Sequence, residues 1–322
     1  MQAFLANSFL LAAVTLSRCV TAQVVGCEAV DCPADGCVVG NTTNLELGIA
    51  NFTSGSLSPD QPLSWTVGIA DIPHHNAVND TWLRSYYLGT PPSLDLDQSG
   101  ISGCALFFED SGTFQFNISA QETSIGTCQD ALTTKCVDDL VARVANITAT
   151  LSSDAATNAN QSTLCSQLGP ALKADLPASC MGPVGLELVP IVAKDLTGSS
   201  SALQPVQQTN CTLTTGGSGY NVGLVTTESY HQQDFAEVYT SGFIFGVTPI
   251  LTLFYPTPSQ PGNSSTALQE PEVHLTCVKI VEAGASDAHG PTLLNAAASR
   301  SIRDLYSFLP VTAFLALIFV AL

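Results

Sequence analysis

Two short stretches of the chain carry side chains of the kinds that bind metal ions. Asp95 and Asp97 begin the sequence Asp-Leu-Asp-Gln-Ser-Gly, which matches the first six positions of a calcium-binding loop. The twelfth position of such a loop is a bidentate glutamate, and here it is Leu106. We therefore expect an acidic turn ahead of a strand, with calcium binding through Asp95 and Asp97 as the alternative.

A histidine pair, His74 and His75, follows Asp71 closely enough to raise the question of a transition-metal site. Adjacent residues of an extended chain point in opposite directions, so the two imidazoles do not converge on one ion. Zinc is also disfavoured, because the chain has no Cys-x-x-Cys pair and its histidines are not spaced as partner ligands. The sequence predicts a polar loop here, and neither a metal nor another cofactor.

Signatures of catalysis are missing from the sequence. It contains no G-x-S-x-G elbow, no P-loop and no H-E-x-x-H helix. A glycosidase needs two carboxylates about 5–10 Å apart. With 27 acidic residues, some pair meets any such criterion. We assign no catalytic residue, and an enzyme of unrecognised type is the less favoured alternative.

Trp82 and Tyr86 are the candidates for carbohydrate binding. They lie in Trp-Leu-Arg-Ser-Tyr-Tyr, which has no regular apolar period and reads as a surface loop. Aromatic side chains present broad apolar faces against which sugar rings pack. Trp65, by contrast, sits on the apolar face of an expected strand and belongs to the core. Trp82 and Tyr86 would therefore stack on glycans in a carbohydrate-binding or wall-modifying protein.

The first region that must position these residues, 23–126, is predicted to be β structure. Apolar residues alternate with polar or small ones over 63–69 and 45–49, which is the period of a half-buried strand. A hairpin is expected between 104–108 and 114–118, because the connecting residues are polar and contain glycine. Cys104, Leu106 and Phe108 then share one face of the first strand.

Region 127–181 has a helical period instead. Leucines and other apolar residues recur every three to four positions from 132 to 151 and again from 164 to 176, with Thr127 as a cap. Gly169-Pro170 is expected to break or restart the second helix. Two antiparallel helices favour a nested pairing of Cys136 with Cys165 and of Cys128 with Cys180, although four cysteines allow three connectivities.

The third region, 182–282, returns to β structure. Apolar and aromatic residues fill 243–255, which predicts buried strands with a bulge or break at Pro249. Residues 273–277 form a last strand, which Cys277 would link to Cys211. The fold class is therefore β-rich α+β: a disulfide-stabilised, β-sandwich-like ectodomain with an inserted helical hairpin.

The cysteine count points to an oxidising compartment. Cys19 falls in the expected signal peptide, which leaves ten cysteines and up to five disulfides. The ten are Cys27, Cys32, Cys37, Cys104, Cys128, Cys136, Cys165, Cys180, Cys211 and Cys277.

Eight Asn-x-Ser/Thr sequons indicate a glycosylated surface. Cys211 lies inside the sequon of Asn210, so a disulfide at this cysteine would compete with glycosylation there. The eight asparagines are Asn41, Asn51, Asn79, Asn117, Asn146, Asn160, Asn210 and Asn263.

Two apolar segments indicate where the protein is located. Segment 4–16 and the small residues before position 23 are typical of a signal peptide over 1–22. Segment 305–322 follows small residues at Asn295 and a polar spacer, the order of a GPI-attachment signal. We expect a linker over 283–295, attachment at Asn295 and removal of 296–322, with Ser286 and Gly290 as alternative attachment sites. A C-terminal span in a type I membrane protein is the alternative, but Arg300 and Arg303 lie on its outer side, against the positive-inside rule.

In this layout the chain resembles the GPI-anchored cell-surface and cell-wall glycoproteins of filamentous fungi. The resemblance covers segment 1–22, the sequons and segment 295–322, and it names no activity. The net charge of −18 disfavours nucleic acid as a partner, because such a surface repels phosphates. The first functional hypothesis is thus a structural or adhesive glycoprotein outside the cell, lipid-anchored to the plasma membrane or lodged in the wall. Wall polysaccharide is the expected partner of the carbohydrate-binding alternative.

Overall fold

The computed structural model describes residues 36–39, 42–72, 80–97, 101–109, 114, 116, 126–155, 164–206, 220–232, 243–244, 246–256, 268 and 270–280. The expected signal peptide, the 283–295 linker, Asn295 and the 296–322 propeptide lie outside these residues. Among the helices of the described ranges, none is both long and apolar enough to cross a bilayer.

One layer of the fold is a five-stranded antiparallel sheet, and it contains the strands predicted from alternation. Its strands, in spatial order, are β3 (Glu46–Phe52), β4 (Leu63–Ile72), β5 (Asp80–Thr90), β9 (Asn221–Gln232) and β8 (Gln204–Pro205). Leu63, Trp65, Val67 and Ile69 of β4 pack in the core between the sheets. Ser64 and Thr66 on the opposite face are buried as well, so β4 is not the half-buried strand that its alternation predicts.

The second layer is a four-stranded antiparallel sheet. It consists of β11 (Glu272–Val278), β10 (Thr248–Pro256), β6 (Ile101–Phe108) and β7 (Ile191–Asp195), in that order. The expected bulge or break at Pro249 is wrong, because Pro249 is the second residue of the continuous strand β10 and pairs with Cys277 of β11 without a shift of register.

The hairpin expected after β6 is wrong. Both edges of β6 are already paired, one with β10 and the other with β7. Phe114 instead lies beside the approach to β10, where its carbonyl accepts the Val247 N–H at 2.9 Å. A polar Gly-containing turn is a local signal, and here long-range pairing with two strands from the C-terminal half outweighs it.

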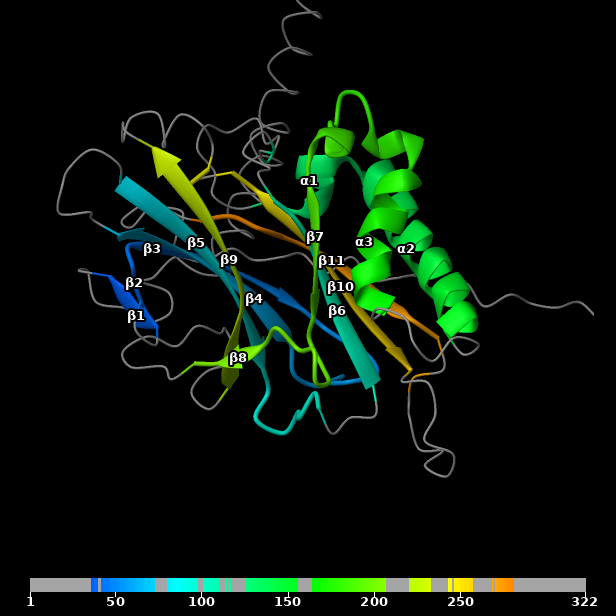
Figure 1. The fold of residues 1–322 in the computed structure, drawn as a ribbon, viewed down its shortest axis with the longest axis horizontal. Coiled ribbons are helices and arrows are strands. Elements are labelled where there is room, and N and C mark those ends of the chain that lie inside the picture. The colour runs from blue at the N-terminus through cyan, green and yellow to red at the C-terminus, as the bar shows by residue number, and fades with distance from the viewer. Residues whose placement is uncertain are drawn as a thin grey trace, which may run out of the picture.

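The two sheets pack against each other and interleave the two β regions (Figure 1). Strands from before and after the helices occur in both sheets, so the regions on either side of the helices form one unit. Trp65 of β4 crosses the interface: its Nε1 donates to Thr252 Oγ1 at 2.8 Å, and its ring meets Phe107 edge-on at 5.4 Å. The predicted strand-rich, disulfide-linked α+β fold is confirmed at this level.

Helices cover the other side of the four-stranded sheet (Figure 1). They are α1 (Cys128–Leu132), α2 (Thr134–Ala155) and α3 (Leu164–Ala174), followed by the short 3-10 turns η2 (Ala178–Cys180) and η3 (Leu186–Leu188). Strand β6 is buried on both faces. Leu106 and Phe108 pack against the helices, and Ala105 and Phe107 pack against the other sheet.

Helix α1 begins where the sequence predicts. The backbone N–H and the hydroxyl of Thr127 both donate to Asp130 Oδ2, each at 2.7 Å. Thr133, with φ of 71°, separates α1 from α2. The apolar positions of α1 and α2 face the same core, but the backbone is not continuously helical from one helix to the other.

The expected break at Gly169-Pro170 is wrong, because α3 runs through Pro170. A proline in a helix interior costs about 3 kcal/mol. Leu168 and Leu172, on either side of it, are fully buried against the sheet. Burial of two leucines contributes about 3–6 kcal/mol, which is enough to keep the helix continuous.

The nested disulfide pairing is also wrong, and so is the expected link from Cys277 to Cys211. The bonds are Cys104–Cys165, Cys128–Cys277 and Cys136–Cys180. The first two join α3 to β6 and α1 to β11, so they fasten the helices to the sheet. The nested pairing assumes that the two helices bond only to each other. Their apolar faces instead pack against the sheet, so Cys128 and Cys165 lie next to sheet cysteines.

A third, smaller cluster lies on the outer face of the five-stranded sheet. The hairpin of β1 (Cys37–Val39) and β2 (Thr42–Asn44) packs there against Tyr87 and Ile49. Cys37 is itself disulfide-bonded. Tyr87 is 2% exposed, so this hairpin seals part of a face that would otherwise meet solvent.

Candidate functional site

The aromatic residues expected to stack on sugars lie inside the protein. Trp82 and Tyr86 belong to β5, not to a surface loop, and are 3% and 0% exposed. The Tyr86 hydroxyl lies 3.1 Å from Thr248 Oγ1 in the opposite sheet, and burial raises the pKa of that phenol. Side chains enclosed in this way offer no face to a sugar, which removes Trp82 and Tyr86 as a stacking site.

Between them lies a residue that the sequence interpretation missed. Arg84 is only 1% exposed and points into the space between the sheets, with Trp82 and Tyr86 on the same face of β5. Its Nη2 donates to the carbonyls of Gly246 at 2.6 Å and Ile244 at 3.3 Å. An arginine at the alternate position between two aromatic residues was the signal that could have identified it.

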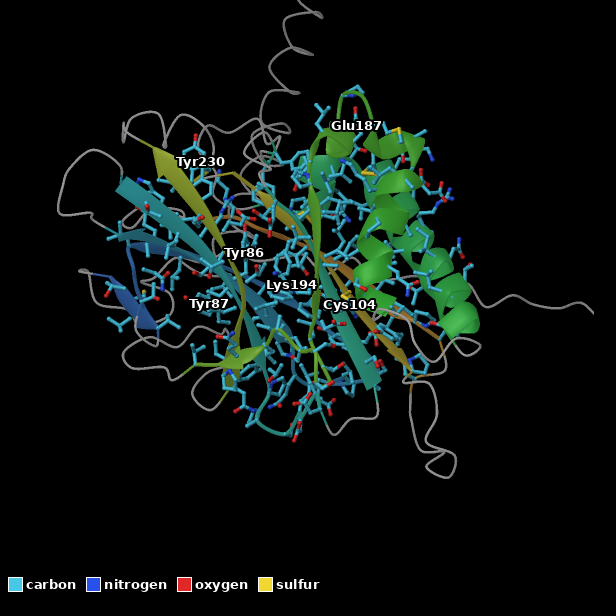
Figure 2. The ribbon with its side chains drawn as sticks, viewed as in Figure 1. Tyr86, Tyr87, Cys104, Glu187, Lys194 and Tyr230 are labelled. Carbon is cyan, nitrogen blue, oxygen red and sulfur yellow. A yellow bond between two sulfur atoms is a disulfide. The ribbon has the colours of Figure 1, made fainter. Side chains whose placement is uncertain are left out.

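Aromatic rings complete the surroundings of Arg84. Its guanidinium carbon lies 5.5 Å from the centre of the Phe243 ring, which stacks on Tyr230 at 4.9 Å. Figure 2 shows Tyr86 and Tyr230 along the same sheet. Glu228 is the cross-strand neighbour of Arg84 on β9 and is partly buried. The arrangement ties the segment that leads into β10 to β5 through Arg84 Nη2, whereas Arg84 Nε is buried without a hydrogen-bond partner among the described residues.

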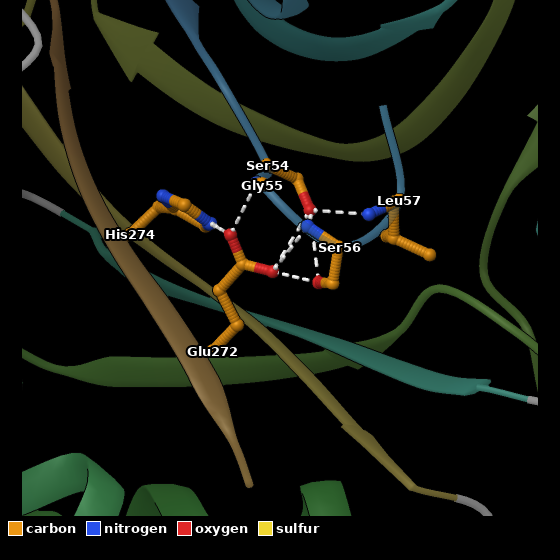
Figure 3. A network of polar contacts seen from close by, with 6 residues as sticks. All are labelled: Ser54, Gly55, Ser56, Leu57, Glu272 and His274. Atoms are coloured by element: carbon orange, nitrogen blue, oxygen red, sulfur yellow. Dashed lines mark hydrogen bonds and ion pairs between the residues drawn. The ribbon is translucent and has the colours of Figure 1, made fainter. Parts of the chain in front are cut away.

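The densest polar network that the structure describes centres on Glu272, the first residue of β11 (Figure 3). Its Oε1 accepts the Gly55 N–H at 2.8 Å and lies 3.0 Å from His274 Nε2. Its Oε2 accepts the hydroxyl of Ser54 at 3.0 Å and that of Ser56. We name these residues, Ser54 to Ser56 with Glu272 and His274, the β11 clasp.

The β11 clasp stabilises the ionised carboxylate. Burial alone would raise the pKa of Glu272, but the hydrogen bonds from His274, Ser56 and Gly55 and the charge of His274 outweigh it. The pKa falls from 4.5 to about 2. The carboxylate is therefore ionised at any physiological pH and joins an edge strand of one sheet to the turn after β3 of the other.

Serine, histidine and glutamate are also the residue types of a hydrolytic triad, but their order in space is different. A nucleophilic serine needs a histidine to remove its proton. Ser54 instead donates to the carboxylate, is fully buried and accepts the Leu57 N–H at 3.1 Å. The β11 clasp is thus built to hold a turn, and the sequence interpretation missed it because its two halves lie 216–218 residues apart.

The acidic turn at Asp95 and Asp97 has a structural role. Asp95 Oδ1 accepts the Asp97 N–H at 3.1 Å, and Asp97 Oδ1 accepts the Gly198 N–H at 3.1 Å. Both carboxylates therefore hold backbone, one in its own turn and one in a distant loop. Within the described ranges, no three His, Cys, Asp or Glu side chains converge as a metal site. His74 and His75 lie outside those ranges.

Two of the predicted glycosylation sites fall in described segments. Asn51 lies in β3 and is half-buried, whereas Asn146 lies in α2 and is exposed. The other six asparagines are outside the described residues. Of the two predicted acceptors, Asn146 is the exposed one.

Comparison with known proteins assigns no family to this chain. No family model matches the chain, and searches of curated proteins and of solved structures find no match either. Its function is therefore inferred from its own residues.

Proposed function

We propose that this chain is a secreted, N-glycosylated, GPI-anchored protein of the cell surface or cell wall, with a structural or adhesive role. The observation that carries the proposal is the state of its cysteines. All seven cysteines that the structure describes are disulfide-bonded. Such bonds persist in exported proteins and are reduced in the cytosol. This supports an extracellular address.

Features of the sequence support the finer parts of the proposal. The apolar segments 4–16 and 305–322 have the patterns of an export signal and a lipid-attachment signal. Eight sequons lie between them. The resemblance to fungal surface glycoproteins rests on this combination. We further propose that the two packed sheets form a β-sandwich-like ectodomain.

The structural or adhesive role is favoured by how the polar residues are used. The β11 clasp, Arg84 and the Asp95–Asp97 turn all connect distant parts of the backbone. Buried Trp82 and Tyr86 weaken the carbohydrate-stacking alternative. A rigid, cross-linked body that carries glycans suits a molecule that spaces or joins surfaces.

The address is tested by expressing the full chain in a eukaryotic secretory host and treating intact cells with a phosphatidylinositol-specific phospholipase C. We expect the protein to be released, and N-glycosidase to reduce its mass. Retention in the membrane with the mass shift would favour the type I span. Intracellular protein with free thiols would overturn the proposal.

The role is tested with the released protein on insoluble β-glucan, chitin and mannan, with soluble sugar assayed in the supernatant. We expect no release of sugar. Release would identify an enzyme and contradict the proposal. Retention without release would assign an adhesive function toward that polymer, and absence of retention from all three would favour contact with other surface proteins.

A further inference from the structure

The outer side of the helical layer contains a groove between α2 and α3. Its volume is about 370 Å³. Pockets that hold small ligands are about 300–1,000 Å³, so the groove has room for one sugar ring. No other element that the structure describes lines this groove.

An exposed glycosylation sequon lines the groove. Asn146 is the acceptor of Asn146-Ile147-Thr148, and both Asn146 and Ile147 line the groove wall. Residues three and four apart share one side of a helix, which places Arg143 and Thr150 beside Asn146. A sugar joined to the Asn146 amide nitrogen would start its path inside the groove.

The chemistry of the groove suits a sugar. Ile147, Leu151 and Ala171 supply an apolar surface from both helices. Arg143 Nη1 and Asp175 Oδ2 form an ion pair at 2.6 Å beside this surface, which joins α2 to the residue that follows α3. Sugar rings have apolar faces and hydroxyl rims, so the apolar surface can take a face while the ion pair offers both a donor and an acceptor.

We infer that this groove binds the first N-acetylhexosamine of a glycan attached to Asn146, and that the sugar thereby bridges α2 and α3. The inference rests on the proposed secretory glycosylation. Covalent attachment at the groove wall is what selects this occupant over a free ligand, because a tethered group has a high local concentration and needs little intrinsic affinity.

The sequon also constrains when the sugar is added. Thr148 is fully buried, and its hydroxyl donates to the Val144 carbonyl at 2.8 Å. A transferase that must reach the threonine of the sequon has no access to it once α2 has packed against the sheet. Attachment at Asn146 therefore precedes the folding of α2, and the groove then closes around a sugar already present.

The test uses the full chain from a secretory host and peptide-N-glycosidase, which cuts the bond between asparagine and the first sugar and leaves aspartate. Mass spectrometry of the peptide that contains Asn146 follows cleavage in native and in denatured protein. If the sugar is bound in the groove, the rate of cleavage in native protein depends on the fraction of molecules in which the sugar has left the groove. We expect it to be at least roughly tenfold slower than cleavage of the denatured chain.

Two variants keep the inference falsifiable. Ala171→Leu fills the groove without removing the sequon, and Asp175→Asn removes the ion pair at an exposed position. We expect both to speed native cleavage at Asn146 toward the denatured rate, while circular dichroism confirms that they fold. Equal native and denatured rates in the wild-type protein, or no change in the Ala171→Leu variant, would overturn the inference.

Occupancy separates this inference from the proposed function. Sugar on other sequons with a bare Asn146 would overturn the inference and leave the secretory address intact. A chain without sugar on any sequon would overturn both.

Discussion

The Gly55 N–H lies 2.8 Å from Glu272 Oε1, and this contact joins two segments that are 217 residues apart in sequence. It connects the turn after β3, in the five-stranded sheet, to the edge strand β11 of the other sheet. Because the carboxylate collects four further contacts, from Ser54, Ser56 and His274, the edge of the β structure is held by charge as well as by packing.

The ionisation of Glu272 should make stability depend on acidity. In the folded protein the pKa of Glu272 is depressed from 4.5 to about 2. The ionised carboxylate therefore makes its full contribution to the free energy of unfolding above about pH 4.5, and this contribution is lost as the pH falls toward 2. We expect Glu272→Gln to lower the free energy of unfolding by about 1–3 kcal/mol at pH 7, with a difference from wild type that shrinks over this window. Urea unfolding at pH 7, 4 and 2.5 measures it.

Glu270→Gln is the matched control, because Glu270 is exposed and precedes the same strand. Its effect should stay within about 0.5 kcal/mol at each pH. A Glu272→Gln difference that does not vary between pH 7 and 2.5 would show that the carboxylate contributes by shape rather than by charge.

Gly48 of β3 should tolerate no side chain. A Cβ at this position would lie 1.7 Å from the Lys279 carbonyl oxygen, where the chain leaving β11 crosses β3. We expect Gly48→Ala to lower the free energy of unfolding by at least about 2 kcal/mol, because backbone must move to admit the methyl group. Chemical denaturation of the secreted protein measures this loss.

Gly55→Ala serves as its comparison. A Cβ at Gly55 meets nothing within 4 Å, and alanine keeps the N–H that Glu272 accepts. Near-equal losses in the two alanine variants would contradict the close approach of β3 to Lys279.

Loss of the disulfides should follow the length of chain that each one closes. Cys128–Cys277 spans 149 residues and Cys136–Cys180 spans 44. The chain-entropy account predicts that removing the first pair costs about 1 kcal/mol more than removing the second. Paired alanine substitutions and urea unfolding test the order, and non-reducing peptide maps test the pairing. The reverse order would indicate that local packing of the helices dominates.

Arg84 should not be replaceable by lysine. Its planar guanidinium donates to two backbone carbonyls and faces the Phe243 ring, whereas a lysine ammonium is a point charge without the planar fork. We expect Arg84→Lys to cost about 2–3 kcal/mol of stability. Arg143→Lys, at a side chain 41% exposed, should change stability by less than about 1 kcal/mol. Equal effects would mean that only charge matters at Arg84.

Some local patterns were interpreted correctly, whereas the turn after β6 and the break at Gly169-Pro170 were not. The alternation in β4 and the three-to-four spacing in α2 predicted the element type, because each period places apolar side chains on one face. The Thr127 cap was predicted for the same reason, since its partners lie within one turn. The cysteine content also predicted disulfide bonding.

Strand pairing, disulfide bonding and hydrogen bonding between residues far apart in sequence were not predictable from local patterns. The pairing of β6 with both β7 and β10, the bond from Cys104 to Cys165 and the β11 clasp depend on which faces meet in three dimensions. The interruption of the apolar period at Arg84 predicts a loop at Trp82 and Tyr86, yet the arginine is buried with them.

The sequence by itself thus determined the type of the strongly periodic elements and, through its cysteines, the chemistry of cross-linking. The tertiary structure alone decided which strands pair, which cysteines bond and which aromatic residues are buried. The physical reason is that periodicity is local, whereas the burial of a residue such as Arg84 is compensated by carbonyls 160–162 residues away in the chain.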